Sequence, residues 1–519
     1  MKTFCAESNL VRVCVACTFI AAFNLWAVDL RVLGATHQVR SADDISDLIE
    51  SRSLAPGDTV VWADGEYTDE EISLNGINGL PKQPITLQAA TPGGVKLLGE
   101  SQIRTNGKWL VIEGFHFVGG KGKVNAYNPI QFRGSGDVGA EHVRLTNCAF
   151  TNLNNNENTA KWVQIYGRFN RVDHCHFSGK PNKGALLTVE LSGLASDQTA
   201  EHTIEWNYFA DVAANDGSDN ETVRLGYSGD QAKPATCTVQ YNLFERCDGE
   251  HEIVSNKSSH NTYRANTFRR CNGSLVLRHG HHATVSGNYF LGDGAADAGG
   301  IRINDSHHKI FNNYMQDLTG LTWNAAISIE GGNKKSNGNS SGYQTVDEVI
   351  IVHNTIVNCA KGILLYDKHG KRAPRGIVAN NLVVAINDDQ KLIDARLSAD
   401  KLMWQSNLFF GFNGSPEQAG IKDQLCVDPK LTKANGRYRV AANSPAIDAA
   451  SDGFEDVKND IRLQPRPESA KDIGADEFTD GSTNVEPSLP LTVAAVGVSF
   501  LKKPGLSIQI FIRTLVSGR

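Results

Sequence analysis

The chain has 519 residues, of which 57 are acidic and 51 basic, and its formal net charge is −6 at pH 7. This balance argues against a nucleic-acid partner, because nucleic-acid-binding domains as a rule carry a basic surface. The 49 glycines, the three methionines and the scarcity of helical periodicity favour an all-β protein rich in turns. Large β architectures often form one unit, so we expect a single domain.

The N-terminal segment has the pattern of an export signal. A mostly apolar run from Val13 to Ala27 follows two basic residues and precedes a polar chain. The run suits a signal peptide and is too short for a membrane span of about 20 residues. We expect residues 1–27 to be removed, the mature protein to be secreted or periplasmic, and no stable membrane insertion. Lipidation at Cys17 stays open as an alternative.

The first element of the mature chain is a predicted capping helix. Ser41 is a favourable N-cap residue, and the apolar residues that follow it recur at helical spacing. After a turn at Pro56, the run Val60–Trp62 is the predicted first strand. The helix would cover the N-terminal end of a stack of coils, because such stacks need capped ends.

A short phrase then recurs along most of the chain: an asparagine or a substitute, followed two or three residues later by an aromatic or aliphatic residue. Its instances begin at Asn147, His174, Asn207, Asn242, Asn266, Asn288, Asn313, Asn354, Asn381 and Asn407. Self-similarity at intervals of roughly 22 to 41 residues indicates a solenoid. We predict a single-domain right-handed parallel β-helix whose coils stack Phe, Ile and Val rows into one core.

The repeated asparagines are interpreted as structural, because a corner residue of this type tolerates left-handed geometry and can bond to the next coil. The seven cysteines outside the signal show no CxxC motif, which predicts buried apolar side chains and no zinc or disulfide framework. Ser444–Asp448 and Asp472–Phe478 are the predicted closing segments. The β-helix domain would therefore span residues 28–479, and residues 480–519 form a tail without a predicted role.

The run from Asp248 to Ser259 carries the clearest chemical pattern. Glu250 and Glu252 stand at alternate positions, so on a strand they would point to one face and could converge on a hard cation. Lys257 follows them, and Arg278 comes one coil of about twenty residues later. Two such glutamates alone would fit a solvated face with a salt bridge. With Lys257 and Arg278 in neighbouring coils, the pattern indicates a catalytic site.

These residues resemble polysaccharide lyase family 6, the alginate lyases and chondroitinase B, over most of residues 30–478. The resemblance is carried by three motifs, Glu250-x-Glu-Ile-Val-Ser-Asn-Lys-Ser258, Leu277-Arg-His-Gly280 and Gly299-Gly-Ile-Arg302. It implies that Glu250, Glu252 and an upstream asparagine bind Ca²⁺. It also implies that Lys257 is the Brønsted base and Arg278 the acid.

The third metal ligand is the least certain position in this pattern. The segment Asp216–Gly226 resembles the family's asparagine-bearing strand, and we choose Asn220 as the ligand. Ser218, with Asp219 nearby, stays open as the alternative.

Five further residues are candidates for substrate binding. Arg224, His279 and Arg302 look like family positions that grip substrate carboxylates, for which a guanidinium is well suited. Tyr166 and Tyr343 are candidates for sugar stacking or proton relay, with a rim aromatic as the alternative for each.

The chemistry of uronate cleavage explains these residue types. β-Elimination removes a weakly acidic proton next to a carboxylate, and a bound Ca²⁺ would neutralise that carboxylate. Lysine acts as a base only if its pKa falls, and both Arg278 and the cation would lower it. Because arginine stays charged, we expect Arg278 to stabilise charge, with a water or a tyrosine as the competing proton donor.

The sequence therefore predicts a secreted, calcium-dependent and monomeric polysaccharide lyase that cleaves alginate by β-elimination. The same chemistry on chondroitin or dermatan sulfate is the first alternative. A β-helix hydrolase with paired carboxylates and a non-catalytic carbohydrate-binding protein are the others. Neither the preference for mannuronate or guluronate nor endolytic or exolytic action follows from the sequence.

Overall fold

The computed structural model describes residues 34–119, 125, 128–154, 159–215, 218–335, 342–479 and 488–502. The predicted signal peptide and Cys17 lie outside these residues. From Gly34 onward the chain groups into one compact unit. Within the described ranges, no helix is both long and apolar enough to cross a bilayer.

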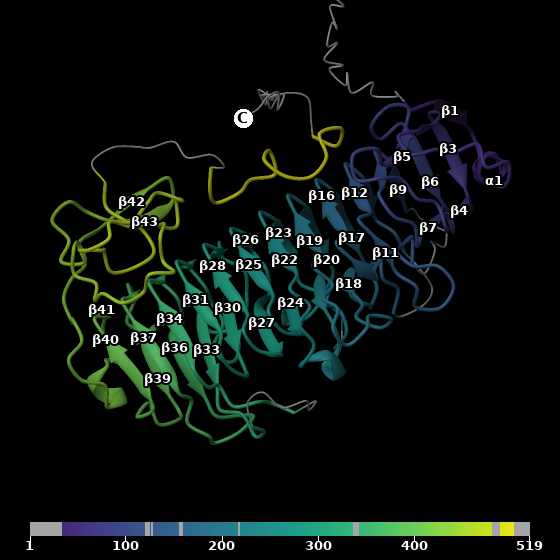
Figure 1. Ribbon diagram of the computed structural model, residues 1–519. Coiled ribbons are helices and arrows are strands. Elements are labelled where there is room, and N and C mark those ends of the chain that lie inside the picture. Colours follow the sequence, from purple (N-terminus) through teal and green to yellow (C-terminus); the bar gives the residue numbers. More distant parts are fainter. Residues whose placement is uncertain are drawn as a thin grey trace, which may run out of the picture. The chain divides into compact units, whose positions relative to one another are not determined.

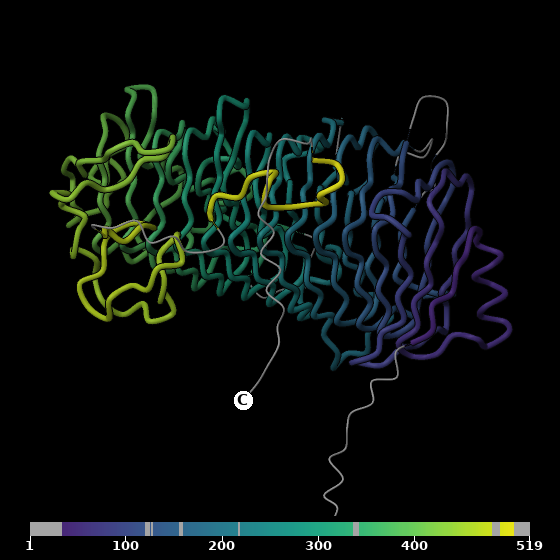
Figure 2. Tube along the Cα trace, turned by 90° about the horizontal axis from the view of Figure 1, so that it is seen from above, coloured from purple at the N-terminus to yellow at the C-terminus, as the bar shows by residue number. Residues whose placement is uncertain are grey.

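Three long parallel sheets build this unit, and neighbouring strands of each sheet come from successive coils (Figures 1 and 2). We call them sheet 1, sheet 2 and sheet 3, in the order in which each coil passes through them. They contain 14, 13 and 12 strands, respectively. Strands that pair in this way across a single coil define a parallel β-helix, so the predicted fold class is confirmed.

Sheet 1 consists of β1 (Thr36–Val39), β2 (Thr59–Trp62), β5 (Ile85–Ala89), β8 (Leu110–Glu113), β12 (Arg144–Thr146), β16 (Arg171–Asp173), β19 (Thr203–Glu205), β22 (Thr238–Gln240), β25 (Thr262–Arg264), β28 (Thr284–Ser286), β31 (Lys309–Phe311), β34 (Val349–Val352), β37 (Gly376–Ala379) and β40 (Leu402–Gln405). Sheet 2 consists of β3 (Gly65–Thr68), β6 (Val95–Leu98), β9 (His116–Val118), β13 (Ala149–Thr151), β17 (His176–Lys180), β20 (Tyr208–Val212), β23 (Leu243–Cys247), β26 (Thr267–Arg269), β29 (Tyr289–Leu291), β32 (Tyr314–Gln316), β35 (Thr355–Val357), β38 (Leu382–Val384) and β41 (Leu408–Phe410).

Sheet 3 consists of β4 (Glu71–Ser73), β7 (Gln102–Arg104), β10 (Ile130–Gln131), β14 (Val163–Ile165), β18 (Leu187–Val189), β21 (Val223–Leu225), β24 (Glu252–Lys257), β27 (Gly273–His279), β30 (Ala298–Ile303), β33 (Ile327–Glu330), β36 (Lys361–Tyr366) and β39 (Lys391–Ala395). The remaining elements are α1 (Ala42–Glu50), the short pair β11 (Ala140–Glu141) and β15 (Gly167–Arg168), the 3₁₀ turns η1 (Ser228–Asp230) and η2 (Glu417–Ala419), and the hairpin β42 (Leu431–Ala434) and β43 (Arg437–Val440).

A row of buried phenylalanines runs through the interior along sheet 2. Rings of successive coils stack with centroids 4.7–5.0 Å apart, from Phe117 to Phe290. This distance matches the separation of adjacent strands in a sheet, about 4.7–4.9 Å. Each ring therefore contacts the equivalent ring above and below, and the row fixes the register of the stack.

The asparagine row is structural, as predicted, but its geometry differs from the prediction. Asn288 Oδ1 accepts hydrogen bonds from the backbone N–H and from Nδ2 of Asn266 in the preceding coil, both at 3.0 Å. The same bonding repeats along the row Asn207, Asn242, Asn266, Asn288, Asn313, Asn354, Asn381 and Asn407. The left-handed residue is the one before each of them, for example Ala265 with a φ of 53°.

In the first two instances of the repeat, the ladder position lies one residue later than the sequence pattern predicts. Asn147 and His174 hold the left-handed corner position, and Cys148 and Cys175 take the place of the ladder asparagine. The cysteines outside the predicted signal are all free, and all but Cys426 are buried. The interpretation as buried small side chains is thereby confirmed for six of these cysteines and is wrong for Cys426.

The N-terminal cap forms as predicted. Ser41 Oγ accepts the backbone N–H of Asp44 at 3.2 Å, and Ile45 of α1 joins the hydrophobic core. The prediction that Val60–Trp62 is the first strand is wrong, because β1 precedes α1 and pairs with β2. A strand of four residues without apolar alternation gives little signal in the sequence.

The predicted closing segments lie along the side of the β-helix and not across its end. Ile473 and Ala446 pack with Leu382 on the outer face of sheet 2. The last coil is covered instead by Ile421, which belongs to the main core and directly follows the turn that contains η2.

The described part of the C-terminal tail covers the same sheet. Leu491 and Val496 pack with Tyr208 and Leu243, the first residues of β20 and β23, and Figure 1 shows this segment in yellow above the strands. The backbone N–H of Leu491 donates to Thr267 Oγ1 at 2.9 Å. Residues 488–502 therefore shield apolar side chains on the outside of sheet 2.

Replacing one ladder asparagine is expected to destabilise the whole stack. Asn288→Ala removes the acceptor of the backbone N–H of Asn266 in a buried site, and it removes one of the two acceptors of Asn266 Nδ2, which keeps its bond to the carbonyl oxygen of Val239. Unsatisfied buried donors cost about 1–3 kcal/mol each, so the free energy of unfolding should fall by about 2–4 kcal/mol. Thermal and denaturant unfolding measure this change. Asn387→Ala, at an exposed position, is the control, and equal stability of both variants would contradict the structural role.

Candidate active site

The candidate site lies on the outer face of sheet 3, where β21, β24, β27 and β30 come from successive coils. The strand register places Arg224, Ser255, Val276 and Arg302 in one outward-facing row. Their neighbours along each strand, such as Leu225 and Leu277, point into the core, because side chains of a strand alternate between its two faces. Polar side chains from four coils are thus brought to one surface.

A register shift between β24 and β27 determines how Arg278 is presented. Asn256 pairs with Leu277, but Lys257 pairs with His279. Arg278 is therefore the extra residue of a β-bulge, a feature that redirects a side chain. Lys257 and Arg278 lie in adjacent coils, as predicted, although they do not face each other directly in the ladder.

The two glutamates of the motif do not share a strand. Glu252 opens β24, whereas Glu250 lies in the bend before it, so the prediction that both lie on one strand face is wrong. Glu250 Oε1 accepts the backbone N–H groups of Asp219 and Asn220 at 3.1 and 3.0 Å. Gly249 permits this close approach, because a Cβ there would lie 2.3 Å from the carbonyl oxygen of Asn220.

Three carboxylates gather at this point, and we call Glu221, Glu250 and Glu252 the carboxylate cluster. The side chain of Glu221 is fully buried. Burial, followed by the charges of Glu221 and Glu252, raises the pKa of Glu250 to about 8. Burial and the two neighbouring carboxylates therefore both disfavour the charged form of Glu250, and a bound cation would favour it.

Asn220 completes a set of oxygen atoms suited to a cation. Its Nδ2 donates to the carbonyl oxygen of Gly249 at 2.8 Å, and its buried Oδ1 has no hydrogen-bond partner among the described residues. A buried oxygen without a partner is costly and calls for an explanation. Carboxylate and amide oxygens are the ligands of hard divalent cations. Asn220, Glu250 and Glu252 therefore fit a metal site.

Lys257 is held by the carboxylate cluster. Its Nζ lies 2.8 Å from Glu221 Oε1. Burial lowers the pKa of Lys257, but the charges of Glu221 and Glu252 outweigh this and leave it above its ordinary value. Without a bound cation, the pKa of Lys257 is therefore raised and not lowered as the sequence predicts. A divalent cation on the cluster would oppose these two charges and lower the pKa of Lys257.

Arg278 and Tyr343 come together beside the cluster. The guanidinium Nε of Arg278 lies 3.7 Å from Glu252 Oε1, and its Cζ lies 3.9 Å from the centroid of the Tyr343 ring. Burial lowers the pKa of Arg278 below its ordinary value. Tyr343 also stacks on His369, with ring centroids 3.7 Å apart, so the ring that covers Arg278 is fixed from its other side.

Arg224 and Arg302 flank the cluster, as predicted. Arg224 Nη1 lies 3.3 Å from Glu221 Oε2, and Arg302 Nε lies 3.3 Å from Glu330 Oε1. Both side chains are almost fully buried. The two guanidinium groups therefore supply positive charge on either side of β24 and β27, the strands that carry Lys257 and Arg278.

His279 and Tyr166 are placed differently from the other candidates. Burial and the charge of Arg278 lower the pKa of His279 to about 4, so its imidazole is neutral near pH 7. Its Nδ1 lies 3.3 Å from Gln344 Oε1. Tyr166 follows β14, three strands from β24 in sheet 3, and its hydroxyl accepts a hydrogen bond from Arg133 at 3.0 Å. None of the contacts described here joins Tyr166 to Lys257 or Arg278.

The sequence matches one known family model, described as chondroitinase B, over residues 39–448. This match spans well over half of the chain. The chain belongs to the chondroitinase B family.

Solved structures that are similar to this chondroitinase B family member include alginate lyases of polysaccharide lyase family 6. The family 6 alginate lyase AlyGC is 32% identical, with a TM-score of 0.71, and the match covers 79% of this chain and 56% of that chain. A mannuronic-acid-specific family 6 lyase from the human gut microbiota is 27% identical, with a TM-score of 0.65, and the match covers 76% of this chain and 92% of that one. The chain thus spans less than two thirds of the length of AlyGC. A comparison with curated protein sequences gave no match.

The sequence motifs of this chondroitinase B family member do not identify several residues that the structure places at the site. Glu221 stands next to Asn220, and its proximity to the proposed ligand was an available signal. Trp323 and His369 stack with ring centroids 6.1 Å apart, and Arg302 Cζ lies 5.5 Å from the Trp323 ring centroid. No short motif points to these two rings, because they come from loops far along the chain that only the coil stacking brings together.

Raising the pH in the presence of a chelator is expected to destabilise the protein. The pKa of Glu250 is about 8 in the folded chain, against an ordinary value of 4.5, so folding is favoured with the proton bound. This stabilisation is complete below the unfolded pKa and is lost as the pH rises through the folded one. The melting temperature should therefore fall between about pH 5.5 and 8.5.

Glu250→Gln is the matched variant for this measurement, because the amide has a similar shape and does not titrate. The fall in melting temperature should be much smaller in this variant. An equal fall in both proteins would show that Glu250 does not carry the pH dependence.

Proposed function

We propose that this protein is an exported, calcium-dependent polysaccharide lyase that cleaves 4-linked uronate chains, with alginate as its substrate, by β-elimination. The observation that carries the proposal is the placement of Lys257 and Arg278 on paired strands beside the carboxylate cluster. Lysine and arginine next to a cation site meet the three requirements of the reaction: a base, a proton donor and neutralisation of the uronate carboxylate. Export rests on residues 1–27, and a secreted protein that begins near Val28 would support it.

Lys257 is the proposed base. It reaches the face of sheet 3 from the end of β24, and its pKa is set by burial, which lowers it, against the charges of Glu221 and Glu252, which raise it. Glu221 orients the ammonium group through the 2.8 Å contact. For Lys257 to accept a proton it must be neutral, which requires that the charge of the carboxylate cluster is offset.

Calcium is the proposed cation, bound by Asn220, Glu250 and Glu252. When bound, it would neutralise the substrate carboxylate and so make the adjacent C–H proton more acidic. The buried Oδ1 atom of Asn220 and the raised pKa of Glu250 support this assignment. A set of oxygen ligands whose negative charge a cation would neutralise explains both features.

Arg278 is the proposed proton donor to the leaving oxygen and stabilises charge at that position. Its lowered pKa supports this role, because burial makes its guanidinium a better acid than a free arginine. Tyr343 is the competing donor, since its ring lies against Arg278. Arg224 and Arg302 are proposed to hold further uronate carboxylates along the row.

The substrate assignment rests on the relatives. AlyGC is an alginate lyase and the gut enzyme is specific for mannuronic acid, which supports alginate for this chain. Chondroitin or dermatan sulfate is the alternative, since the matching family model takes its name from chondroitinase B. A hydrolase is a further alternative, because the pKa of Glu250 is raised while that of Glu252 is lowered. Such divergence is also what an acid–base pair of carboxylates needs.

Replacing the proposed base is expected to remove activity. Lys257→Ala should lower kcat on alginate by roughly 10²–10⁴-fold, the usual contribution of a general base. The assay follows the ultraviolet absorbance of the unsaturated uronate on poly-mannuronate, poly-guluronate and dermatan sulfate. Lys96→Ala, a surface lysine paired with Glu66, is the control and should be fully active.

The outcome of the same assay separates the alternatives. Chain cleavage without ultraviolet absorbance would identify a hydrolase. The absence of cleavage of any polymer in the presence of Ca²⁺ would favour a carbohydrate-binding protein. Full activity of Lys257→Ala would exclude this lysine as the base.

A pair of variants distinguishes the two candidate proton donors. Tyr343→Phe keeps the ring on Arg278 but removes the hydroxyl, so kcat should change by less than about tenfold if Arg278 is the donor. Arg278→Ala should lower kcat by roughly 10²–10⁴-fold. If Tyr343→Phe is as inactive as Arg278→Ala, the tyrosine is the donor and the role of Arg278 is reduced to stabilising charge.

A further inference from the structure

A column of left-handed residues runs along the corner that precedes sheet 1. Each of them stands two residues before the register row that begins at Val111 and Arg144, and all have φ between 49° and 63°. Along the chain they are Trp109, His142, Phe169, Glu201, Thr236, His260, His282, His307 and Glu348. Because one backbone conformation repeats in adjacent coils, these side chains stack on one another.

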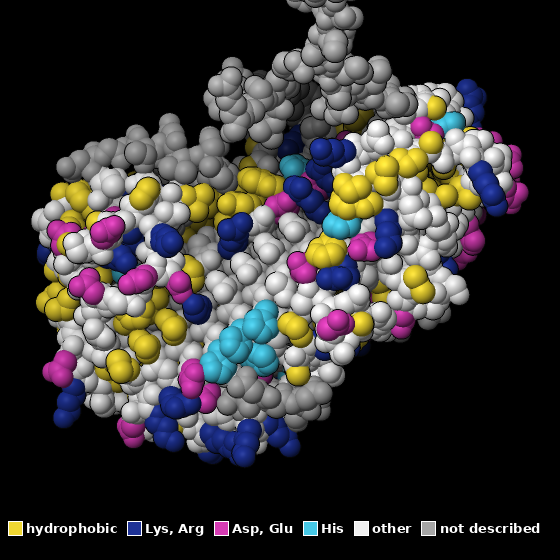
Figure 3. Space-filling model, viewed as in Figure 1, with side chains coloured by type: hydrophobic (Ala, Val, Ile, Leu, Met, Phe, Trp, Pro, Cys, Tyr) yellow, Lys and Arg dark blue, Asp and Glu magenta, His cyan; other side chains and the backbone are white. Residues whose placement is uncertain are grey.

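Histidines occupy three successive positions of this column. The rings of His260 and His282 stack with centroids 4.7 Å apart, and those of His282 and His307 with centroids 4.5 Å apart. His281, which precedes His282, packs edge-on against it. Four of the protein's 15 histidines therefore meet at one place, and Figure 3 shows them as a continuous surface patch.

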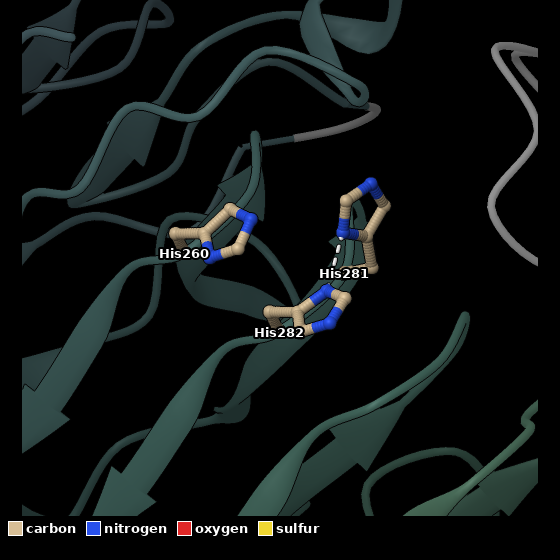
Figure 4. Close-up of side chains that lie close together, drawn as sticks. All are labelled: His260, His281 and His282. Carbon is tan, nitrogen blue, oxygen red and sulfur yellow. Dashed lines mark hydrogen bonds between the residues drawn. The ribbon is translucent and has the colours of Figure 1, made fainter.

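Three of these imidazoles are close enough to share one ion. One ring nitrogen from each of His260, His281 and His282 lies within 4.8 Å of the other two. The Nδ1 atoms of His281 and His282 are 2.7 Å apart, and Figure 4 shows these two atoms facing each other. Metal–nitrogen bonds are about 2.0–2.1 Å long, so rotation of the rings would be needed to bring all three nitrogens onto one ion.

The surroundings favour the neutral form of His281 and His282 and leave the histidine cluster accessible. Burial and the neighbouring histidines lower the pKa of His281 to about 4, and they lower that of His282 as well. Neutral imidazole is the form that binds metals. His260 and His282 are exposed, and His282 and His307 line a surface groove of about 510 Å³. An ion can therefore reach the ring nitrogens from solvent.

A contact with Glu348 orients His307, the next histidine of the column. His307 Nδ1 lies 3.0 Å from Glu348 Oε2, and its ring supports that of His282. The aromatic stack at the other end of the column, Trp109 with His142 and Phe169, has no second histidine and offers no such set of nitrogens.

We propose that His260, His281 and His282 form a site for one divalent transition-metal ion of the Zn²⁺ type. Imidazole nitrogen suits zinc, copper and nickel, whereas calcium prefers oxygen. The site is therefore chemically separate from the oxygen ligands at Asn220, Glu250 and Glu252, and it does not depend on the proposed function.

The position of this site gives it a consequence for the fold. His260 follows Lys257 by three residues, and His281 follows Arg278 by three residues. An ion shared by these histidines would tie together the corners of the two coils that carry Lys257 and Arg278. A metal ion with ligands from both coils would link them and raise the thermal stability of the folded chain.

Cobalt titration tests the proposal, because Co²⁺ reports nitrogen ligation through its visible absorption bands. The probe is Co²⁺ alone, added to the full chain without a histidine tag, in saturating Ca²⁺ to fill any oxygen site. About one equivalent should bind with a rise in visible absorbance, and Zn²⁺ should displace it. His281→Ala and His260→Ala should each weaken binding ~10-fold or more.

His142→Ala is the matched control, since His142 holds the same corner position in a ring stack without other histidines. It should bind Co²⁺ like the unchanged protein. Zn²⁺ should raise the melting temperature of the unchanged protein and of His142→Ala, but not that of His281→Ala. The proposal is overturned if no equivalent of Co²⁺ binds. It is also overturned if His281→Ala and His260→Ala, shown to be folded by their unchanged spectra and melting, bind like His142→Ala.

Discussion

The gathering of Glu221, Glu250 and Glu252 on one face of the β-helix is the constraint on which the rest of the site depends. Carboxylates taken out of water and placed near one another are unfavourable unless positive charge is supplied. The chain supplies part of it through Lys257 and Arg278, while burial and the charges of Glu221 and Glu252 raise the pKa of Glu250. A cation at this cluster would lower the cost of gathering the carboxylates, which is the physical link between the proposed metal site and the proposed base and acid.

The β-helix makes this concentration of charge possible because its core fixes the register of every coil. Stacked phenylalanines and the asparagine ladder hold successive coils about 4.8 Å apart, and the strands of sheet 3 inherit this alignment. Against such a rigid background, the bulge that displaces Arg278 and the tight turn at Gly249 are local adjustments. They set where the charges lie without disturbing the core.

The repeat, the fold class and the capping helix could be predicted from the sequence, because periodic apolar residues and an N-cap serine are local signals. The catalytic candidates Lys257 and Arg278 could be placed in neighbouring coils for the same reason. The details of the strand register could not be predicted from the sequence. Glu250 lies outside its strand because of close backbone contacts with Asn220. Trp323 and His369 join the site only through the stacking of coils that are far apart in the chain, which no single segment records.

We expect the carboxylate cluster to hold a proton that a bound cation replaces. Calorimetric titration with Ca²⁺ at pH 7, repeated in buffers with different ionisation enthalpies, measures this exchange. Binding should release about one proton per ion, since metal and proton compete for the same carboxylates. Glu250→Gln should abolish this release. Calcium binding without proton release, or unchanged release in Glu250→Gln, would contradict the exchange of a proton for the cation.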